Sequence, residues 1–555
     1  MITWSLLYYL SEWVVRLVML VVVTRRHRPA SAMAWLLVIF FIPWPGAVLY
    51  WLIGSNRLPR RRILAHRHMQ QRLSAVAQRI AAHPSVVHPE LGPDAAAAVK
   101  LAERLGAMPI LGGNHVDLIA DTDQMIDRLV ADIDAAEDHV HLLFYIYAND
   151  DTGRRVAAAL IRAAERGVTC RLLVDAVGSR RMLKELAPEL TRRGVQVHAA
   201  LPVGLFRRRM ARIDLRNHRK IAVIDGRVGY TGSQNIVSAS YGTHDLVWED
   251  LMLVITGPGV LELQAVFVSD WYFESNEMLD RDHLFPQPEL VGNVPIQVIP
   301  GGPGGELEAE GEDADGSGPK GKAAADGAAR SGEPTSVKQA PSSDEHNTGR
   351  FPSPRRRRKN DSRRAYPRPS RKEMAAAAVE PTPRNNTTEN FQRLVVAALY
   401  TARHSVCFTT PYFVPDEPLI QALQVAVMRG VDVELIIPRR SDQRLVAAAS
   451  RAYYEEMLQS DVKLFRYEPG LLHAKTLCID DRFALVGSSN LDIRSFELNF
   501  EINVLLYDGE VAERLRRQQA VYRAASRRLT LEQWRARPAW KRLRDNIAKL
   551  LSPLL

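Results

Sequence analysis

The sequence predicts an α/β protein that consists of two similar halves and is preceded by a transmembrane helical hairpin. Three observations support this fold class: two long apolar runs open the chain, strand and helix patterns alternate through most of the rest, and one stretch recurs in outline later. The 555 residues suffice for several domains, and 46% hydrophobic with 25% charged residues excludes collagen-like, coiled-coil and wholly disordered chains. The three cysteines lie far apart, which excludes a disulfide scaffold or zinc finger.

Residues 1–56 are expected to form the hairpin. The apolar runs at 2–23 and 32–54 are each about as long as the ~20 residues that span a bilayer, and a short basic loop joins them. Glu12 and Arg16 lie four residues apart on one helix face of the first run, where they can neutralise each other. Helix-breaking residues are expected to kink or break the second run midway, namely Pro43, Pro45 and Gly46.

The arginines predict which side of the membrane holds the rest of the chain. The loop between the runs carries three arginines, whereas residues 57–72 carry six. Positive residues favour the cytoplasmic side, so the large C-terminal part is expected inside the cell. The alternative is a signal peptide cleaved at residues 30–32; the uncharged start and the arginines beside that point disfavour it.

Composition divides the remainder into a basic connector (57–115), a first half (116–300), a low-complexity insert (301–390) and a second half (391–555). Only six insert residues are Val, Ile, Leu, Met, Phe, Trp or Tyr, too few to offset the ordering entropy, so a disordered insert is expected. Most of the net charge of +10 belongs to the insert, because residues 355–372 hold ten Lys or Arg and one acid. This tract fits either an anionic leaflet or a solvated tail, and it is no evidence for nucleic acid.

The two halves repeat each other. Residues 135–179 are matched in outline by residues 401–441: an apolar β-branched run, a polar loop, a helix-period stretch, Arg-Gly-Val and a second strand. An amphipathic helix precedes each copy. Strands that alternate with helices indicate parallel βαβ units and a sheet covered by helices.

A set of six residue types occurs late in each half with the same spacing. Every member of the second set lies 255 residues beyond its counterpart, an agreement that chance does not explain. The two sets are His218, Lys220, Asp225, Gly232, Ser233 and Asn235, and His473, Lys475, Asp480, Gly487, Ser488 and Asn490.

These residue types fit chemistry on a phosphodiester. Each His and Lys begins an alternating apolar run, so both side chains are expected on one face of a strand. Two such strands that face each other would form one shared site with two imidazoles, two ammonium groups, and hydroxyl and amide donors. One imidazole would attack phosphorus and the other protonate the leaving oxygen, while the lysines and neutral donors hold the developing charge. No metal or other cofactor is expected.

The pattern HxK(x)4D(x)6GSxN, complete in both halves, resembles the signature of the phospholipase D superfamily. Within it, the N-terminal apolar segment, TPYFVPDE, DIRSFELNFE and the terminal LRDNIAKLLSPLL resemble bacterial cardiolipin synthases. The resemblance implies two phospholipase D-type halves that share one active site, and a multi-pass location in a bacterial inner membrane. It also implies phosphatidylglycerol and anionic membrane lipid as partners, without nucleic acid.

A ping-pong phosphatidyl transfer follows from the same resemblance. His218 would attack the phosphate of one phosphatidylglycerol, form a phosphohistidine and release glycerol. His473 would protonate that glycerol and then deprotonate the terminal hydroxyl of a second phosphatidylglycerol. The reverse assignment fits the repeat equally well.

Four carboxylates complete the implied site. In the family a carboxylate after each motif holds the imidazole Nδ1–H, and Asp250 and Glu501 lie at matching places. Asp225 and Asp480 are expected to support the site structurally. Glu249 departs from the family pattern, which often has arginine there, and the insert interrupts a connection that is usually short.

Other functions remain open at this stage. A membrane-bound phospholipase D would deliver water and release phosphatidic acid. A membrane-tethered nuclease is disfavoured by the hairpin and by basic charge outside the halves, and an inactive scaffold by two complete motifs. The terminal stretch 534–555 is amphipathic and basic; it is expected to pack on the second half, with the membrane interface as the alternative.

Overall fold

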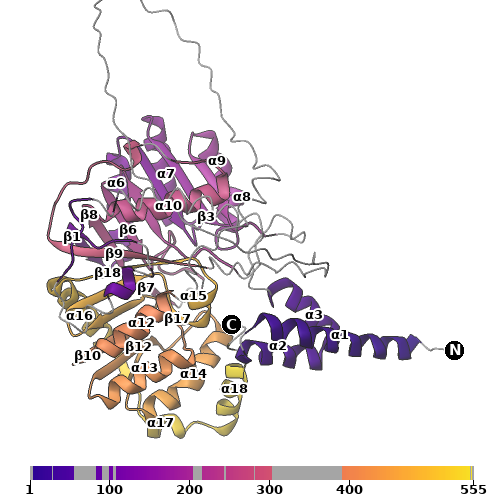
Figure 1. Cartoon of the computed structure of the whole chain (residues 1–555). Helices are drawn as coiled ribbons and strands as arrows, with labels where there is room; N and C mark the ends of the chain where they lie inside the picture. The colour runs from indigo at the N-terminus through magenta and orange to yellow at the C-terminus, as the bar shows by residue number, and fades with distance from the viewer. Residues whose placement is uncertain are drawn as a thin grey trace, which may run out of the picture. The chain divides into compact units, whose positions relative to one another are not determined.

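The computed structural model (Figure 1) describes most of both halves and of the N-terminal segment. The predicted disorder of the insert and the role of the tract 355–372 lie outside the described residues. Strand structure already begins at Leu111, which lies inside the expected connector. Before the insert, the last strand ends at Gly301, and the next helix begins at Asn390. The described residues are 4–27, 29–54, 80, 83–89, 99–103, 105, 108–203, 215–242, 246–279, 282–302, 390–550 and 552.

The N-terminal segment consists of α1 (Trp4–Arg26), α2 (Pro29–Phe41), α3 (Pro43–Leu49) and a π-helical turn, Tyr50–Gly54. Among the described residues, α1 is the one helix long and apolar enough to cross a membrane. The second apolar run breaks between α2 and α3, because a proline at the start of α3 cannot continue the hydrogen bonding of α2. The predicted break is therefore confirmed, and the expected hairpin has one continuous span and one broken run.

Arg16 links α1 to this break. Its Nε donates to the carbonyl oxygen of Phe40 at 3.2 Å, and its guanidinium pairs with Glu12 at 3.4 Å. One arginine thus neutralises the acid on α1 and satisfies a backbone carbonyl near the end of α2.

Strands of the first half occupy one side of a 15-stranded sheet. In chain order, this half contains β1 (Leu111–Ile119), α6 (Thr122–Ala135), β2 (His139–Phe144), α7 (Asp151–Glu165), β3 (Thr169–Asp175), α8 (Arg180–Glu185), α9 (Ala187–Arg192), β4 (Gln196–Ala200), β5 (Ile221–Ile224), β6 (Val228–Gly232), β7 (Trp248–Glu249), β8 (Met252–Thr256) and α10 (Val260–Ser275). The sheet order is β4-β3-β2-β5-β6-β8-β1. Parallel pairing is confirmed for β2, β3 and β4, whereas β5, β6 and β8 are antiparallel.

The second half repeats this arrangement. It contains α12 (Asn390–Thr401), β10 (Ser405–Thr409), β11 (Phe413–Val414), α13 (Glu417–Met428), β12 (Asp432–Pro438), α14 (Arg444–Gln459), β13 (Lys463–Tyr467), β14 (Leu471–Leu472), β15 (Thr476–Ile479), β16 (Phe483–Gly487), β17 (Leu491–Asp492), α15 (Ile493–Glu497), β18 (Glu501–Leu506), α16 (Gly509–Ala524), β19 (Ser526–Arg528), α17 (Leu531–Arg535) and α18 (Ala539–Leu550). Its order is β19-β13-β12-β10-β15-β16-β18, again with three parallel strands, β10, β12 and β13.

A central strand, β9 (Val294–Gly301), joins the halves. It pairs antiparallel with β18 on one side and with β1 on the other, so the sheet runs through both halves without interruption. One hydrophobic core cluster contains residues of β5 and β8, of β16 and β18, and of helices α10 and α16. Because this core draws on both halves, they are expected to hold their relative position firmly.

A half-buried carboxylate lies in the turn after each motif strand and closes that turn. Asp225 accepts hydrogen bonds from the backbone N–H groups of Glu137, Asp138 and His139, at 2.8–2.9 Å. Asp480 accepts the same three bonds from Arg403, His404 and Ser405, at 2.7–2.9 Å. Each carboxylate therefore fixes the strand that lies beside its motif strand.

We expect Asp480→Ala to lower the free energy of unfolding by about 2–4 kcal/mol, since three backbone donors lose a charged acceptor. Asp480 has φ 52°, so alanine also adds backbone strain. Asp461→Ala is the matched control, because Asp461 is an exposed turn residue with φ 60°. Denaturant unfolding of the full chain in detergent would measure both. Equal losses would contradict a role for the three hydrogen bonds.

Candidate active site

The backbone of each half holds the motif histidine of the other half. His218 N–H donates to the carbonyl oxygen of Phe500 at 2.8 Å, and His473 N–H donates to that of Glu249 at 2.7 Å. The second contact extends the parallel pairing of β14 with β7. This contact uses the backbone carbonyl of Glu249. It therefore does not depend on the side chain at position 249, which departs from the family pattern.

Each imidazole also meets a carboxylate from the opposite half. His473 Nδ1 lies 2.7 Å from Asp250 Oδ1, and His218 Nδ1 lies 3.2 Å from Glu501 Oε1. Both carboxylates are buried, with side-chain exposures of 6% and 0%. With Nδ1 engaged, Nε2 is the ring atom available for attack or proton transfer.

Serine hydroxyls hold these carboxylates. Ser233 Oγ donates to Asp250 at 2.6 Å and Ser488 Oγ donates to Glu501 at 2.5 Å. Each hydroxyl also accepts a backbone N–H, from Leu251 or from Ile502, at 2.9 Å. The serines therefore position the carboxylates, and a direct contact from these hydroxyls to phosphate stays a prediction.

The asparagines of the two motifs differ in their contacts. Asn235 Oδ1 accepts the backbone N–H of Ile146 at 3.0 Å. Asn490 Oδ1 is buried and has no hydrogen-bond partner among the described residues. The preceding Gly232 and Gly487 lie against the backbone of β8 and β18, where a Cβ atom would come within 2.5 Å of a backbone oxygen. Glycine is thus required for the close strand approach that brings each serine to its carboxylate.

The two motif lysines place positive charge in the buried site. Lys220 is 2% exposed and Lys475 is 4% exposed, and each ammonium donates to the carbonyl oxygen of its own motif histidine at 2.6 Å. Burial lowers the pKa of Lys220 to about 8 and that of Lys475 to about 7, although Asp250 and Glu501 oppose this shift. A phosphate anion bound between them would supply the negative charge that favours their protonated forms.

The pKa of His473 shifts in the direction that burial favours, whereas that of its carboxylate Asp250 shifts against it. Burial and the charge of Lys475 lower the pKa of His473 to about 4, despite Asp250. Burial would raise the pKa of Asp250, but His473, Lys475 and Ser233 outweigh it and lower that pKa to about 2. At neutral pH this pair therefore consists of a neutral imidazole beside an ionised carboxylate.

Three side chains that the motif analysis missed complete the surroundings of the imidazoles. The ring of Tyr145 lies 4.3 Å from that of His218, and the ring of Trp248 lies 4.6 Å from that of His473. Asn499 Nδ2 lies 3.4 Å from His218 Nδ1. Trp248 and Asn499 each precede the orienting carboxylate by two residues, a shared spacing that could have revealed them.

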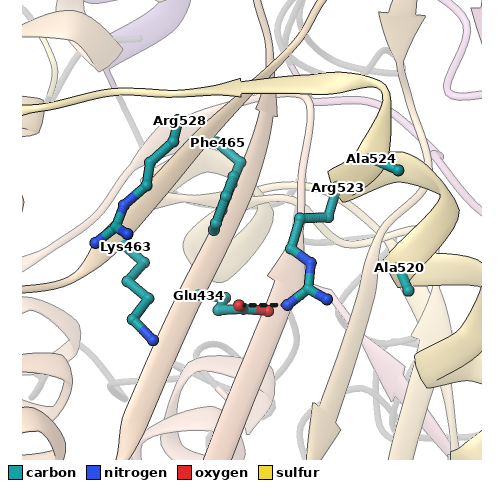
Figure 2. A pocket seen from close by; sticks show the side chains of 7 residues that line it. All are labelled: Glu434, Lys463, Phe465, Ala520, Arg523, Ala524 and Arg528. Atoms are coloured by element: carbon teal, nitrogen blue, oxygen red, sulfur yellow. Dashed lines mark hydrogen bonds and ion pairs between the residues drawn. The ribbon is translucent and has the colours of Figure 1, made fainter.

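A shallow hollow beside β13 is separate from this site (Figure 2). Its lining includes no motif residue, and two of its three cations are already paired. Arg523 pairs with Glu434 at 2.8 Å, and Lys463 pairs with Asp432 at 2.7 Å. The hollow therefore does not belong to the site formed by the motif residues. The hollow is lined by Glu434, Lys463, Phe465, Ala520, Arg523, Ala524 and Arg528.

The low pKa of His473 predicts a pH-dependent stability. An unfolded histidine titrates near ~6.5, whereas native His473 stays neutral down to about pH 4, so only the unfolded state gains a proton between these values. The free energy of unfolding should therefore fall by about 2 kcal/mol from this residue as the pH drops from about 6.5 to about 5. His473→Gln should remove that part of the pH dependence, and His115→Gln, at an exposed histidine, should retain it. Identical slopes in both variants would refute the buried neutral imidazole.

Comparisons with known proteins agree with this geometry. Residues 129–271 and 395–520 match the family described as Cardiolipin synthase, PLD-like domain, and residues 14–55 match the Phospholipase D-nuclease N-terminal family. The chain is 32% identical to Cardiolipin synthase A of Pectobacterium carotovorum subsp. carotovorum, over 100% of this chain and 99% of that protein. It is 31% identical to Cardiolipin synthase A of Proteus mirabilis, over 96% and 95%.

A solved structure supports the fold independently. Phosphatidylserine synthase of Haemophilus influenzae superposes with a TM-score of 0.53 at 13% identity, covering 82% of this chain and 100% of that protein. At this identity the likeness concerns the fold alone. The full-length similarity and the family match in both halves establish that the chain belongs to the cardiolipin synthase family of phospholipase D-like proteins.

Proposed function

We propose that this protein makes cardiolipin by transferring the phosphatidyl group of one phosphatidylglycerol to the terminal hydroxyl of another, with release of glycerol. The observation that carries the proposal is the crossed arrangement of two complete motifs, in which each imidazole meets a carboxylate of the opposite half. Full-length similarity to cardiolipin synthases favours a lipid alcohol over water as the acceptor.

The reaction consists of two displacements at one phosphorus. Nε2 of His218 attacks, the bond from phosphorus to the glycerol oxygen breaks, and His473, protonated once the anionic phosphate has entered the site, gives that oxygen a proton. His473 then removes the proton from the hydroxyl of the second phosphatidylglycerol, whose oxygen displaces His218. The reverse assignment of the two histidines uses the same geometry, so a trapped intermediate must decide between them.

The remaining motif residues receive supporting roles in this proposal. Lys220 and Lys475 bind the phosphate and the charge that develops on it, because both ammonium groups are buried at the site. Asn235 and Asn490 are assigned to the phosphate as well, because the –NH2 group of each amide can donate to a phosphate oxygen. Ser233 and Ser488 reach the phosphate only if they release a carboxylate. Asp225 and Asp480 act through the turns that position the motif strands.

For the membrane, we propose an inner-membrane location with two passes and cytoplasmic halves. α1 supplies the first pass, and α2 with α3 supplies a broken second pass. Large apolar side chains along the broken run are exposed, among them Phe41 at 80% and Ile42 at 53%, as expected for lipid contact. The arginine excess after residue 56 supports the orientation.

Purified protein with phosphatidylglycerol alone should form cardiolipin and glycerol, followed by mass spectrometry. His218→Ala and His473→Ala should each lower the rate by at least about 10³-fold, because each removes one of the two groups that move protons or bond phosphorus. His115→Ala is the control, since His115 is an exposed histidine on β1. Phosphatidic acid as the main product would instead indicate a hydrolase. If only one of the two single-histidine variants retains an acid-labile label from the substrate, the motif histidine that remains in that variant is the nucleophile.

The orientation is testable with cysteines, because the three native cysteines are buried. A membrane-impermeant thiol reagent added to cells with a permeabilised outer membrane should label Arg25→Cys, at the end of α1. It should leave Glu532→Cys unlabelled, although Glu532 is exposed on α17. Labelling of Glu532→Cys in these cells would contradict the proposed orientation.

A further inference from the structure

The last helix, α18, turns its apolar face away from the protein. Four large apolar residues follow one another at helical spacing and are exposed by 53–64%. This spacing places them in a single stripe along the helix. They are Trp540, Leu543, Ile547 and Leu550.

The opposite face of α18 is fixed against α14 by a buried carboxylate. The Asp545 side chain is 1% exposed and pairs with Arg451 at 3.1 Å, Arg537 at 2.9 Å and Arg544 at 2.9 Å. Ala548 is buried one turn further on. Rotating the helix to bury its apolar stripe would remove this carboxylate from the guanidinium groups of Arg451 and Arg537, which lie outside α18. The outward orientation of the stripe is therefore enforced by ion pairs.

Positive charge flanks the stripe. Lys541 Nζ lies 5.5 Å and the Arg544 guanidinium 5.7 Å from the centre of the Trp540 ring. The helix carries four basic residues, and its one acid, Asp545, is the buried and fully paired one. An exposed aromatic and aliphatic stripe with a basic margin matches the headgroup region of an anionic bilayer, where tryptophan and cationic side chains are both favourable.

We propose that α18 is a second membrane contact, which lies in the interface of an anionic leaflet and docks the catalytic body on its surface. The occupant of the apolar stripe is lipid, because charge complementarity selects anionic headgroups and the polar face is already occupied by α14. This contact is additional to the α1 span and does not depend on which lipid reaction the site performs. Packing on the second half and contact with the membrane are therefore not exclusive, because the two faces of α18 serve both.

A single fluorescent label can locate the stripe. Leu543→Cys in the full chain carries an environment-sensitive fluorophore, and the native cysteines do not compete because all three are buried. Val521→Cys is the control, since Val521 is an apolar residue of α16 that is 60% exposed. The labelled proteins are placed in vesicles that contain phosphatidylglycerol. Aqueous iodide and a lipid carrying a quencher at the headgroup level are then applied separately.

Membrane contact predicts that the label at 543 is quenched by the lipid-borne quencher and protected from iodide by roughly threefold relative to position 521. Full access of iodide to position 543 would overturn the proposal. Protection from both quenchers would also overturn it, because a protein segment or a second copy would then cover the stripe.

Activity gives an independent readout. Leu543→Glu with Ile547→Glu should lower turnover on vesicles by at least about fivefold and leave turnover on detergent-dispersed lipid unchanged, since two apolar side chains no longer favour the interface. Val521→Glu also replaces an exposed apolar side chain with a glutamate, but outside α18. It should leave the ratio of turnover on vesicles to turnover on detergent-dispersed lipid unchanged. Equal losses on vesicles and micelles would contradict an interfacial role. The quenching result stands whatever product the enzyme forms, so failure of the proposed reaction and failure of this contact are distinguishable.

Discussion

The crossed contacts between imidazoles and carboxylates are the constraint on which the rest of this structure depends. Asp250 of the first half orients His473, and Glu501 of the second half orients His218. Neither half alone holds a complete pair, so the site exists only where the two halves meet. The junction of β1, β9 and β18 and the core shared by α10 and α16 keep that meeting point rigid.

Charge balance explains why the carboxylates, lysines and serines must be buried together. Two ammonium groups removed from water lose hydration, and the depressed pKa values of Lys220 and Lys475 record that cost. Asp250 and Glu501 offset part of it, while serine hydroxyls keep these acids in place. An anionic phosphodiester adds the missing negative charge, so substrate binding and protonation of the lysines favour each other.

Much of this arrangement could be predicted from the sequence, because the repeated spacing of 255 residues identifies both motifs, and the family resemblance implies the carboxylates that follow them. The crossing of partners between halves could not, since spacing within a half says nothing about which half faces it. The serine contacts were also missed: a hydroxyl beside a phosphate site suggests a phosphate ligand, yet Ser233 and Ser488 are held by buried acids. In α18, periodicity revealed an amphipathic helix, but only Asp545 and its arginines decide which face packs inward.

Residues outside the motifs make the two histidines unequal. Position 248 is a tryptophan whose ring covers His473, whereas the matching position is Asn499, a small polar side chain near His218. The His473 side chain is accordingly 9% exposed and that of His218 21%. Such a difference gives the two imidazoles different access to water, and it arises from side chains outside the repeated pattern. The repeat thus supplies two copies of the same catalytic groups, and the side chains two residues before each carboxylate give those copies different surroundings.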